Sequence, residues 1–224
     1  MKKILNTVIT KFYLFLDRLL YRSRDFVVIS NNCWGAEIYK SLGLEYNTPF
    51  VGLFIYGPDY IKLLQNFDLY MNSKLTFADK SKWLDSAVSY PVGTLQDVEI
   101  HFLHYKNAEE ALSKWNRRTN RMLKTTDKDK YYYKICDRDS GNKNDNLVKF
   151  HELPFKNKIS FGINGLNNIS HIQVRENENN QTVPDGVKLY RYSYKYVDVL
   201  NWINSGTIKT NLYSKIKSAL LVRM

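Results

Sequence analysis

The sequence predicts an α/β protein with a mostly parallel, Rossmann-like sheet and helices on both faces, in three layers. Short β-branched or aromatic runs, such as residues 25–30 and 131–136, alternate with stretches of helical spacing. Strands that alternate with helices in this way are typical of parallel sheets. The chain of 224 residues has only 10 Gly and 5 Pro, which favours long regular elements.

The same patterns predict three parts. Residues 1–24 are expected to contain an amphipathic helix, residues 25–186 an α/β core domain, and residues 187–224 a basic strand and helical extension packed on the core. Two interpretations of the N-terminal helix stay open. It can pack on the domain with a solvated basic face, or it can lie in the plane of a membrane with its cations at headgroup level.

The first core strand, residues 25–30, ends in the polar sequence Asn31-Asn32-Cys33 and is followed by a helix that Gly43 ends as a C-cap. Gly57-Pro58 begins the next helix, with Pro in its first turn.

The segment around which the chain is organised follows. Residues 97–105 alternate as a strand, and residues 107–122 have helical spacing, with Asn107 as N-cap and Glu110 as its capping-box partner. Later elements are a strand over 131–136, a helix over 145–152, a strand over 158–161 and an edge strand over 171–174. In the C-terminal extension, residues 189–196 alternate aromatic and basic side chains, and helices follow over 196–204 and 211–222.

The net charge of +11 is confined to the two ends of the sequence. Residues 1–24 contain six basic residues and one acidic residue, a net charge of +5. Residues 187–224 contain seven basic residues and one acidic residue, a net charge of +6. The middle is neutral, which disfavours nucleic acid as a partner and favours an anionic membrane surface near the ends. The two cysteines form no metal or disulfide pattern, so we expect a cytoplasmic protein, peripheral to the inner face of the membrane.

Ligands of parallel α/β sheets collect at the carboxyl ends of the strands. Here those ends offer Ser30, Asn31 and Asn32 after the first strand, and His104 and Tyr105 after the organising strand. His104 is the candidate general acid or base; a purely structural histidine is the alternative. His101 and His104 point to opposite faces of a strand, so they are not predicted to share a metal ion.

Asp137, Arg138 and Asp139 follow the strand over 131–136. Two carboxylates around one residue can hold Mg²⁺ or Mn²⁺ on a diphosphate, with Arg138 on the phosphate. A surface turn is the competing interpretation. Asp137 is therefore a candidate catalytic and metal-binding residue, and Asp139 a candidate metal ligand.

Two further features could carry chemistry. Cys33 begins a helix and could act as a nucleophile with His104 as base, although a buried structural thiol is more common. The helix over 107–122 has a basic face on which Arg117 is predicted to bind a phosphate together with Arg121; Lys114 and Arg118 lie on the same face. No P-loop, GxGxxG, nucleophile elbow or HExxH motif occurs.

Six short sequences occur in order between residues 25 and 161: Ser-Asn-Asn-Cys-Trp-Gly at 30–35, Tyr-Asn-Thr-Pro-Phe-Val-Gly-Leu at 46–53, Tyr-Pro-Val-Gly at 90–93, His-Phe-Leu-His-Tyr at 101–105, Trp-x-Arg-Arg at 115–118 and Leu-Pro-Phe-Lys-Asn-Lys at 153–158. Together they resemble a bacterial family of unknown function labelled as exopolysaccharide or capsular polysaccharide biosynthesis proteins. The resemblance implies a cytoplasmic bacterial protein connected with surface polysaccharide assembly.

The sequence therefore leads to the hypothesis of a glycosyl- or other group-transferase that uses an activated sugar or another phosphorylated small molecule at the membrane surface. Asn31, Asn32 and Arg138 would hold the donor, Asp137 and Asp139 a cation, and His104 would accept the proton of the acceptor. The alternative is a non-catalytic scaffold or partner protein in the same pathway.

Overall fold

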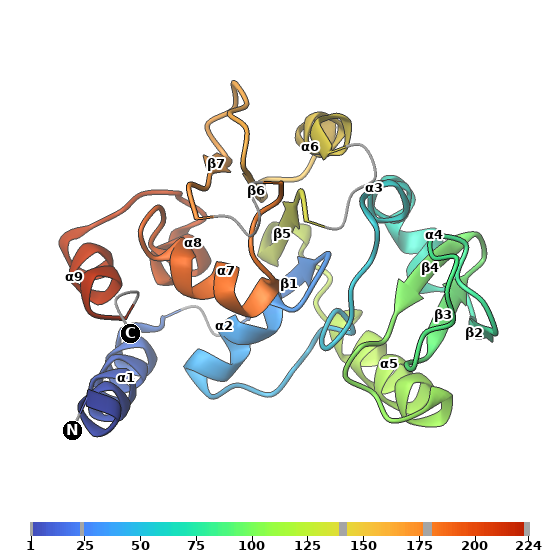
Figure 1. Ribbon diagram of the computed structural model, residues 1–224, viewed down its shortest axis with the longest axis horizontal. Coiled ribbons are helices and arrows are strands. Elements are labelled where there is room, and N and C mark those ends of the chain that lie inside the picture. Colours follow the sequence, from blue (N-terminus) through green and yellow to red (C-terminus); the bar gives the residue numbers. More distant parts are fainter. Residues whose placement is uncertain (1, 23–24, 139–142, 177–180, 222–224) are drawn as a thin grey trace.

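The computed structural model describes residues 2–22, 25–138, 143–176 and 181–221 and contains two sheets (Figure 1). The larger sheet is fully parallel, with the strand order β1-β5-β6-β7. Its strands are β1 (Val27–Ser30), β5 (Tyr131–Cys136), β6 (Asn157–Gly162) and β7 (His171–Gln173). The predicted α/β class is confirmed.

The second sheet departs from the predicted single Rossmann-like sheet. It is antiparallel and has the order β2 (Leu75–Ala78), β3 (Val92–Leu95) and β4 (Val98–His101). Only Gln96 and Asp97 connect β3 to β4, and Gln96 has a φ of +54°. Two residues can join antiparallel neighbours but cannot make a parallel crossover. The predicted organising strand therefore belongs to a hairpin, outside the parallel sheet.

Helices cover both faces of the parallel sheet, as expected. The helices are α1 (Lys2–Leu20), α2 (Trp34–Leu42), α3 (Gly57–Gln65), α4 (Phe67–Met71), α5 (Ala108–Met122), a 3₁₀ turn (Lys128–Lys130), α6 (Lys143–Glu152), α7 (Gly186–Ser193), α8 (Val199–Ser205) and α9 (Leu212–Leu221). Val28, Tyr132 and Phe161 pack in one hydrophobic cluster with α2, α7 and α8. Ile29 and Tyr133 pack in the other cluster with α3, α5, α6 and the antiparallel sheet.

Local signals at helix ends are confirmed. The side chain of Asn107 accepts a hydrogen bond of 2.9 Å from the backbone N–H of Glu110, so α5 begins where the cap predicted. Glu110 reaches back to the N–H of Lys106, one residue before the position that a capping box uses. Gly43 ends α2 with a φ of +69°, and α3 begins at Gly57.

The alternating stretch at 189–196 is mostly helical, so the strand predicted there is wrong. Asp185 caps α7 by accepting 3.0 Å hydrogen bonds from the backbone N–H groups of Val187 and Lys188. Leu189 and Tyr190, then Ser193 and Tyr194 one turn later, are buried, which is a helical spacing.

The two terminal helices pack against each other. The buried Lys217 ammonium of α9 forms an ion pair with the buried Asp17 carboxylate of α1, which also accepts a 2.8 Å hydrogen bond from the Tyr213 hydroxyl. α1 also contacts α2. Among the described residues, no helix is both long enough and apolar enough to cross a membrane.

Candidate functional site

A short segment, residues 52–55, joins the two sheets; we call it the seam. Phe54 exchanges two 2.9 Å backbone hydrogen bonds with His101 of β4, and the N–H of Ile55 donates to the carbonyl of Asn31 just after β1. The N–H of His104 donates to the carbonyl of Gly52 at 3.0 Å. The seam thus brings the loop after β4 next to the corner after β1, although these strands lie in different sheets.

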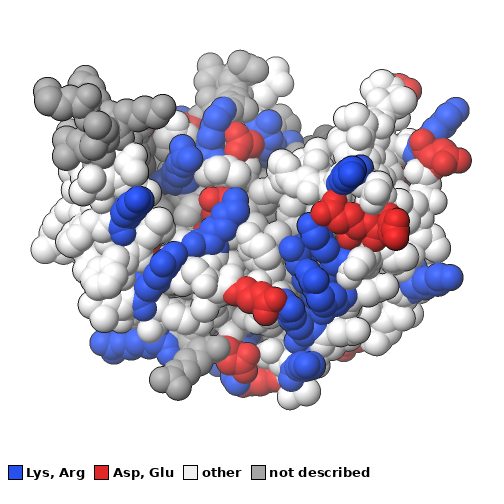
Figure 2. All heavy atoms as spheres, turned by 90° about the horizontal axis from the view of Figure 1, so that it is seen from below, with Lys and Arg blue, Asp and Glu red and all other residues white. Residues whose placement is uncertain are grey.

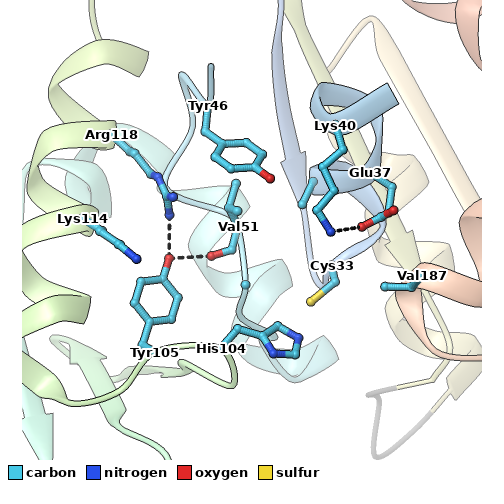
Figure 3. A pocket seen from close by; sticks show the side chains of 12 residues that line it. Cys33, Glu37, Lys40, Tyr46, Val51, His104, Tyr105, Lys114, Arg118 and Val187 are labelled. Carbon is cyan, nitrogen blue, oxygen red and sulfur yellow. Dashed lines mark hydrogen bonds and ion pairs between the residues drawn. The ribbon is translucent and has the colours of Figure 1, made fainter. Parts of the chain in front are cut away.

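A pocket of about 350 Å³ opens at this junction, between α2 and α5 (Figure 3). Its volume lies within the range of small-molecule sites. We call it the seam pocket. It is lined by Cys33, Ala36, Glu37, Lys40, Tyr46, Val51, Gly52, His104, Tyr105, Lys114, Arg118 and Val187.

Arg118 is the most informative residue of the seam pocket because it is only 8% exposed. Its Nη1 donates a 2.7 Å hydrogen bond to the hydroxyl of Tyr105, which in turn donates to the carbonyl of Val51 at 2.6 Å. The guanidinium also lies 5.0 Å from the ring centroid of Tyr46. Within the described residues, no carboxylate lies within ion-pair distance of Arg118. A buried guanidinium with neutral partners is costly unless an anion binds to it.

Two lysines add positive charge at the entrance. Lys40 pairs with Glu37 at 2.6 Å and Lys114 pairs with Glu110 at 2.5 Å, and both ammonium groups keep contact with solvent. Seen from below, the molecule carries a dense group of Lys and Arg on the side where α5 lies (Figure 2). The lining contains Lys40, Lys114 and Arg118 against the carboxylate of Glu37, so positive charge is in excess and favours an anionic ligand.

His104 and Cys33 provide the chemically reactive groups. The imidazole and the thiol both project into the seam pocket from opposite walls (Figure 3). His104 is exposed, whereas His101 is fully buried and lies 2.8 Å from the Glu99 carboxylate. Burial lowers the pKa of His101. The two histidines thus lie in separate environments, and of the two only His104 can reach a ligand in the seam pocket.

The predicted ligand-binding residues at the end of β1 are buried and do not line the seam pocket. Ser30 and Asn31 are fully buried and Asn32 is 5% exposed. The side-chain oxygens of Asn31 and Asn32 accept hydrogen bonds of 3.1 and 2.9 Å from the ammonium of Lys134, which is also fully buried. These side chains thus hold a buried cation of β5, and they shape the corner that carries Cys33.

The corner after β5 lies elsewhere. Asp137 is 2% exposed, and its two carboxylate oxygens accept hydrogen bonds of 2.8 and 3.0 Å from the backbone N–H groups of Ile163 and Val183. Arg138 donates to the carbonyl of Val183 at 3.4 Å. Neither residue lines the seam pocket, and Asp139 lies outside the described residues. Among the described His, Cys, Asp and Glu side chains, no group of three is arranged to hold a metal ion.

Of the predicted basic face, Arg118 and Lys114 line the seam pocket, while Arg117 is exposed to solvent. Arg121 pairs with Glu45 at 2.6 Å and donates to the carbonyl of Tyr46. Sequence reasoning assigned no role to Lys40 or to the buried Lys134. A lysine within an apolar strand is the signal that could have identified Lys134.

The fold and site define a mixed α/β protein with an anion-favouring pocket where its two sheets meet. Residues 4–204 match the family described as "Domain of unknown function (DUF1919)", and the chain belongs to that family. It is also 40% identical over 163 residues to a Haemophilus influenzae protein named "Uncharacterized protein", a match that covers 71% of this chain and 74% of the relative. Membership of a family of unknown function agrees with the resemblance, but neither the family's description nor the relative's name mentions polysaccharide.

Proposed function

We propose that the seam pocket binds a phosphorylated small molecule, most simply an activated sugar, and that the protein transfers a group from it. The observation that carries the proposal is Arg118, a buried guanidinium without a carboxylate partner among the described residues, on the wall of a 350 Å³ pocket. A diphosphate would accept hydrogen bonds from the unused N–H groups of Arg118 and gain charge from Lys40 and Lys114. The sugar part of the proposal is supported by the resemblance to surface polysaccharide proteins.

In this proposal, the acceptor hydroxyl group forms a bond to the transferred group as the bond from that group to the phosphate breaks. The phosphate leaves with its negative charge held by Arg118, and His104 accepts the proton of the hydroxyl group. It is the imidazole on the pocket wall, and the Gly52 carbonyl fixes its backbone. Replacing a general base typically lowers the rate by roughly 10²–10⁴-fold. The variant His104→Ala is therefore expected to bind ligand but to lose turnover. Cys33→Ala tests the competing nucleophile: its loss of turnover, with His104→Ala active, would reassign the chemistry.

The binding test is calorimetric titration with a panel of nucleoside diphosphate sugars, with and without Mn²⁺ because the sequence also predicts a cation. Arg118→Ala is expected to weaken binding by about tenfold or more, as charge-assisted hydrogen bonds contribute roughly 1.5–3 kcal/mol. Arg117→Ala, its exposed neighbour on α5, is the matched control and is expected to bind normally. Equal affinities of the two variants would contradict the proposal.

The alternative, a non-catalytic scaffold in the same pathway, makes a different prediction. A scaffold does not need to bind a small molecule in the seam pocket. Titration of the wild-type chain with every nucleoside diphosphate sugar of the panel would then show no heat of binding. Such a result, obtained with correctly folded protein, would favour the scaffold over the transferase.

A further inference from the structure

The outer side of α1 carries an apolar stripe that the fold leaves in solvent. Val8, Phe12, Phe15 and Leu19 are 58, 56, 63 and 69% exposed, and their spacing of four, three and four residues places them on one side of the helix. Tyr13, which is buried, lies on the inner side of the same helix. Packing within the described residues therefore does not account for the outer stripe.

A second stripe lies on the neighbouring helix α9. Leu212, Ile216 and Leu220 are 74, 47 and 41% exposed, four residues apart. α1 and α9 lie side by side at one end of the molecule (Figure 1). The distance between the ring centroids of Tyr13 and Tyr213 is 5.8 Å. The buried contact between the helices thus places both stripes at the same end of the molecule. We call the two stripes together the terminal surface; its residues are Val8, Phe12, Phe15, Leu19, Leu212, Ile216 and Leu220.

The charged side chains around the stripes indicate which kind of partner would bind this surface. Lys11, Arg22 and Lys215 are exposed beside the stripes, and no ion pair involves them within the described residues. The only acidic residue of α1 is Asp17, which is buried, and α9 has none. In Figure 2, the end of the molecule where α1 lies presents mostly uncharged side chains with Lys and Arg among them. Among the described residues of α1 and α9, large apolar side chains thus lie beside cations, and no carboxylate is exposed.

We propose that the terminal surface binds the headgroup region of an anionic lipid bilayer. Phe12, Phe15 and Leu19 enter the boundary between headgroups and acyl chains, and the neighbouring cations pair with lipid phosphates. This is the arrangement of helices that lie in the plane of a membrane. The terminal segments carry the whole excess charge of the chain, which matches the negative potential of an anionic leaflet.

The test is flotation of the full chain with vesicles of phosphatidylcholine alone and of phosphatidylcholine mixed with phosphatidylglycerol. We expect flotation only with the anionic vesicles, and its loss at about 1 M salt, which screens charges. Phe15→Gln combined with Leu19→Gln is expected to reduce the bound fraction at least tenfold, as is Lys11→Glu with Lys215→Glu. Because these side chains are exposed, the variants keep the fold.

Matched controls come from apolar side chains elsewhere on the surface. Leu69 and Ile169 are 55 and 94% exposed, so Leu69→Gln with Ile169→Gln removes similar apolar area and is expected to float like wild type. Wild-type protein that stays at the bottom of the gradient, or a Phe15/Leu19 variant that floats normally, overturns the proposal.

Light scattering tests whether a second copy of the chain binds the surface instead. A dimer of the wild-type chain that is absent in the Phe15/Leu19 variant would also overturn the proposal. Arg118→Ala is expected to float normally, which separates this proposal from that of the pocket.

Discussion

Gly52 is the residue on which the geometry of the seam pocket depends most directly. Its φ is +72°, a region that side chains with a Cβ rarely adopt. A Cβ at this position would lie 3.2 Å from Cε2 of Tyr105 and 3.4 Å from Cβ of His104. The absence of a side chain therefore lets the seam pass close to both pocket residues.

We predict that Gly52→Ala destabilises the fold by about 1–2 kcal/mol, the cost of a left-handed backbone for a residue with a Cβ. The same change is expected to weaken ligand binding, because the displaced ring of Tyr105 carries the hydroxyl that contacts Arg118. Urea unfolding and the calorimetric titration measure the two effects. Gly165→Ala is the control, since a Cβ there meets only the flexible end of Gln173, at 3.4 Å. Equal behaviour of the two variants would contradict this account.

The sequence identified some pocket residues and not others for physical reasons. His104 and Tyr105 could be found because a polar pair after an alternating strand is a local pattern. The basic face of α5 was visible too, but which arginine lines a pocket depends on what packs beside the helix. Arg118 rather than Arg117 is buried because Tyr46 and Tyr105, distant in sequence from each other, enclose it.

At the scale of elements, α6, β6 and β7 are tied together by a chain of side-chain hydrogen bonds. Nε2 of His171 lies 2.8 Å from the carbonyl of Asn164, so it carries the proton in the neutral ring. Its Nδ1 then accepts from the Ser160 hydroxyl at 2.8 Å, and the Ser160 oxygen accepts from Nε2 of His151 at 2.7 Å. Nδ1 of His151 is left unprotonated, buried and without a partner among the described residues.

This arrangement predicts a loss of stability in mild acid. Burial, and then electrostatic interactions with Lys158 and His171, lower the pKa of His151 from 6.5 to about 4. Between pH 6.5 and pH 4 the unfolded chain therefore binds more protons than the folded one at this residue, so the free energy of unfolding falls as the pH falls through that window. Urea midpoints at pH 7 and pH 5 measure the fall.

The variant His151→Gln is expected to show a smaller difference between the two midpoints. It will not remove the difference completely, because burial also lowers the pKa values of His171 and His101. His104→Gln, which changes an exposed histidine, is the control. A wild-type midpoint that rises on acidification would contradict the assigned protonation states.

Elements defined by local signals could be predicted, and those defined by distant contacts could not. α5 was predicted because Asn107 and the apolar spacing lie within the helix itself. The partner of β4 was not predicted, because an alternating strand does not show which strand it will pair with. The aromatic and basic residues at 189–196 suggested a strand; the Asp185 cap and the burial of Leu189 and Tyr190 against α2 and the parallel sheet select a helix.

For the molecule as a whole, the contact between α1 and α9 links segments far apart in sequence. Burial lowers the pKa of Lys217, and the Asp17 carboxylate opposes that shift. The ammonium also lies 3.9 Å from the ring centroid of Tyr194. Removing one member of such a pair leaves the other as an uncompensated buried charge.

We predict that Asp17→Asn and Lys217→Met each destabilise the protein by about 3–5 kcal/mol, and that the double variant loses much less than their sum. Chemical denaturation of the four proteins forms the cycle. Lys40→Met breaks a pair with an exposed ammonium and is expected to cost less than about 1 kcal/mol. Additive effects of the two buried substitutions would show that Asp17 and Lys217 do not stabilise each other.

The ion pair between residues 17 and 217 also bears on the order of events during synthesis. Ribosomes deliver the polypeptide from its amino end, so Asp17 emerges 200 residues before the ammonium that neutralises it. Closing so long a loop is a late step of folding. Throughout translation of the core, the first helix can contact α2 but lacks the lysine that neutralises Asp17.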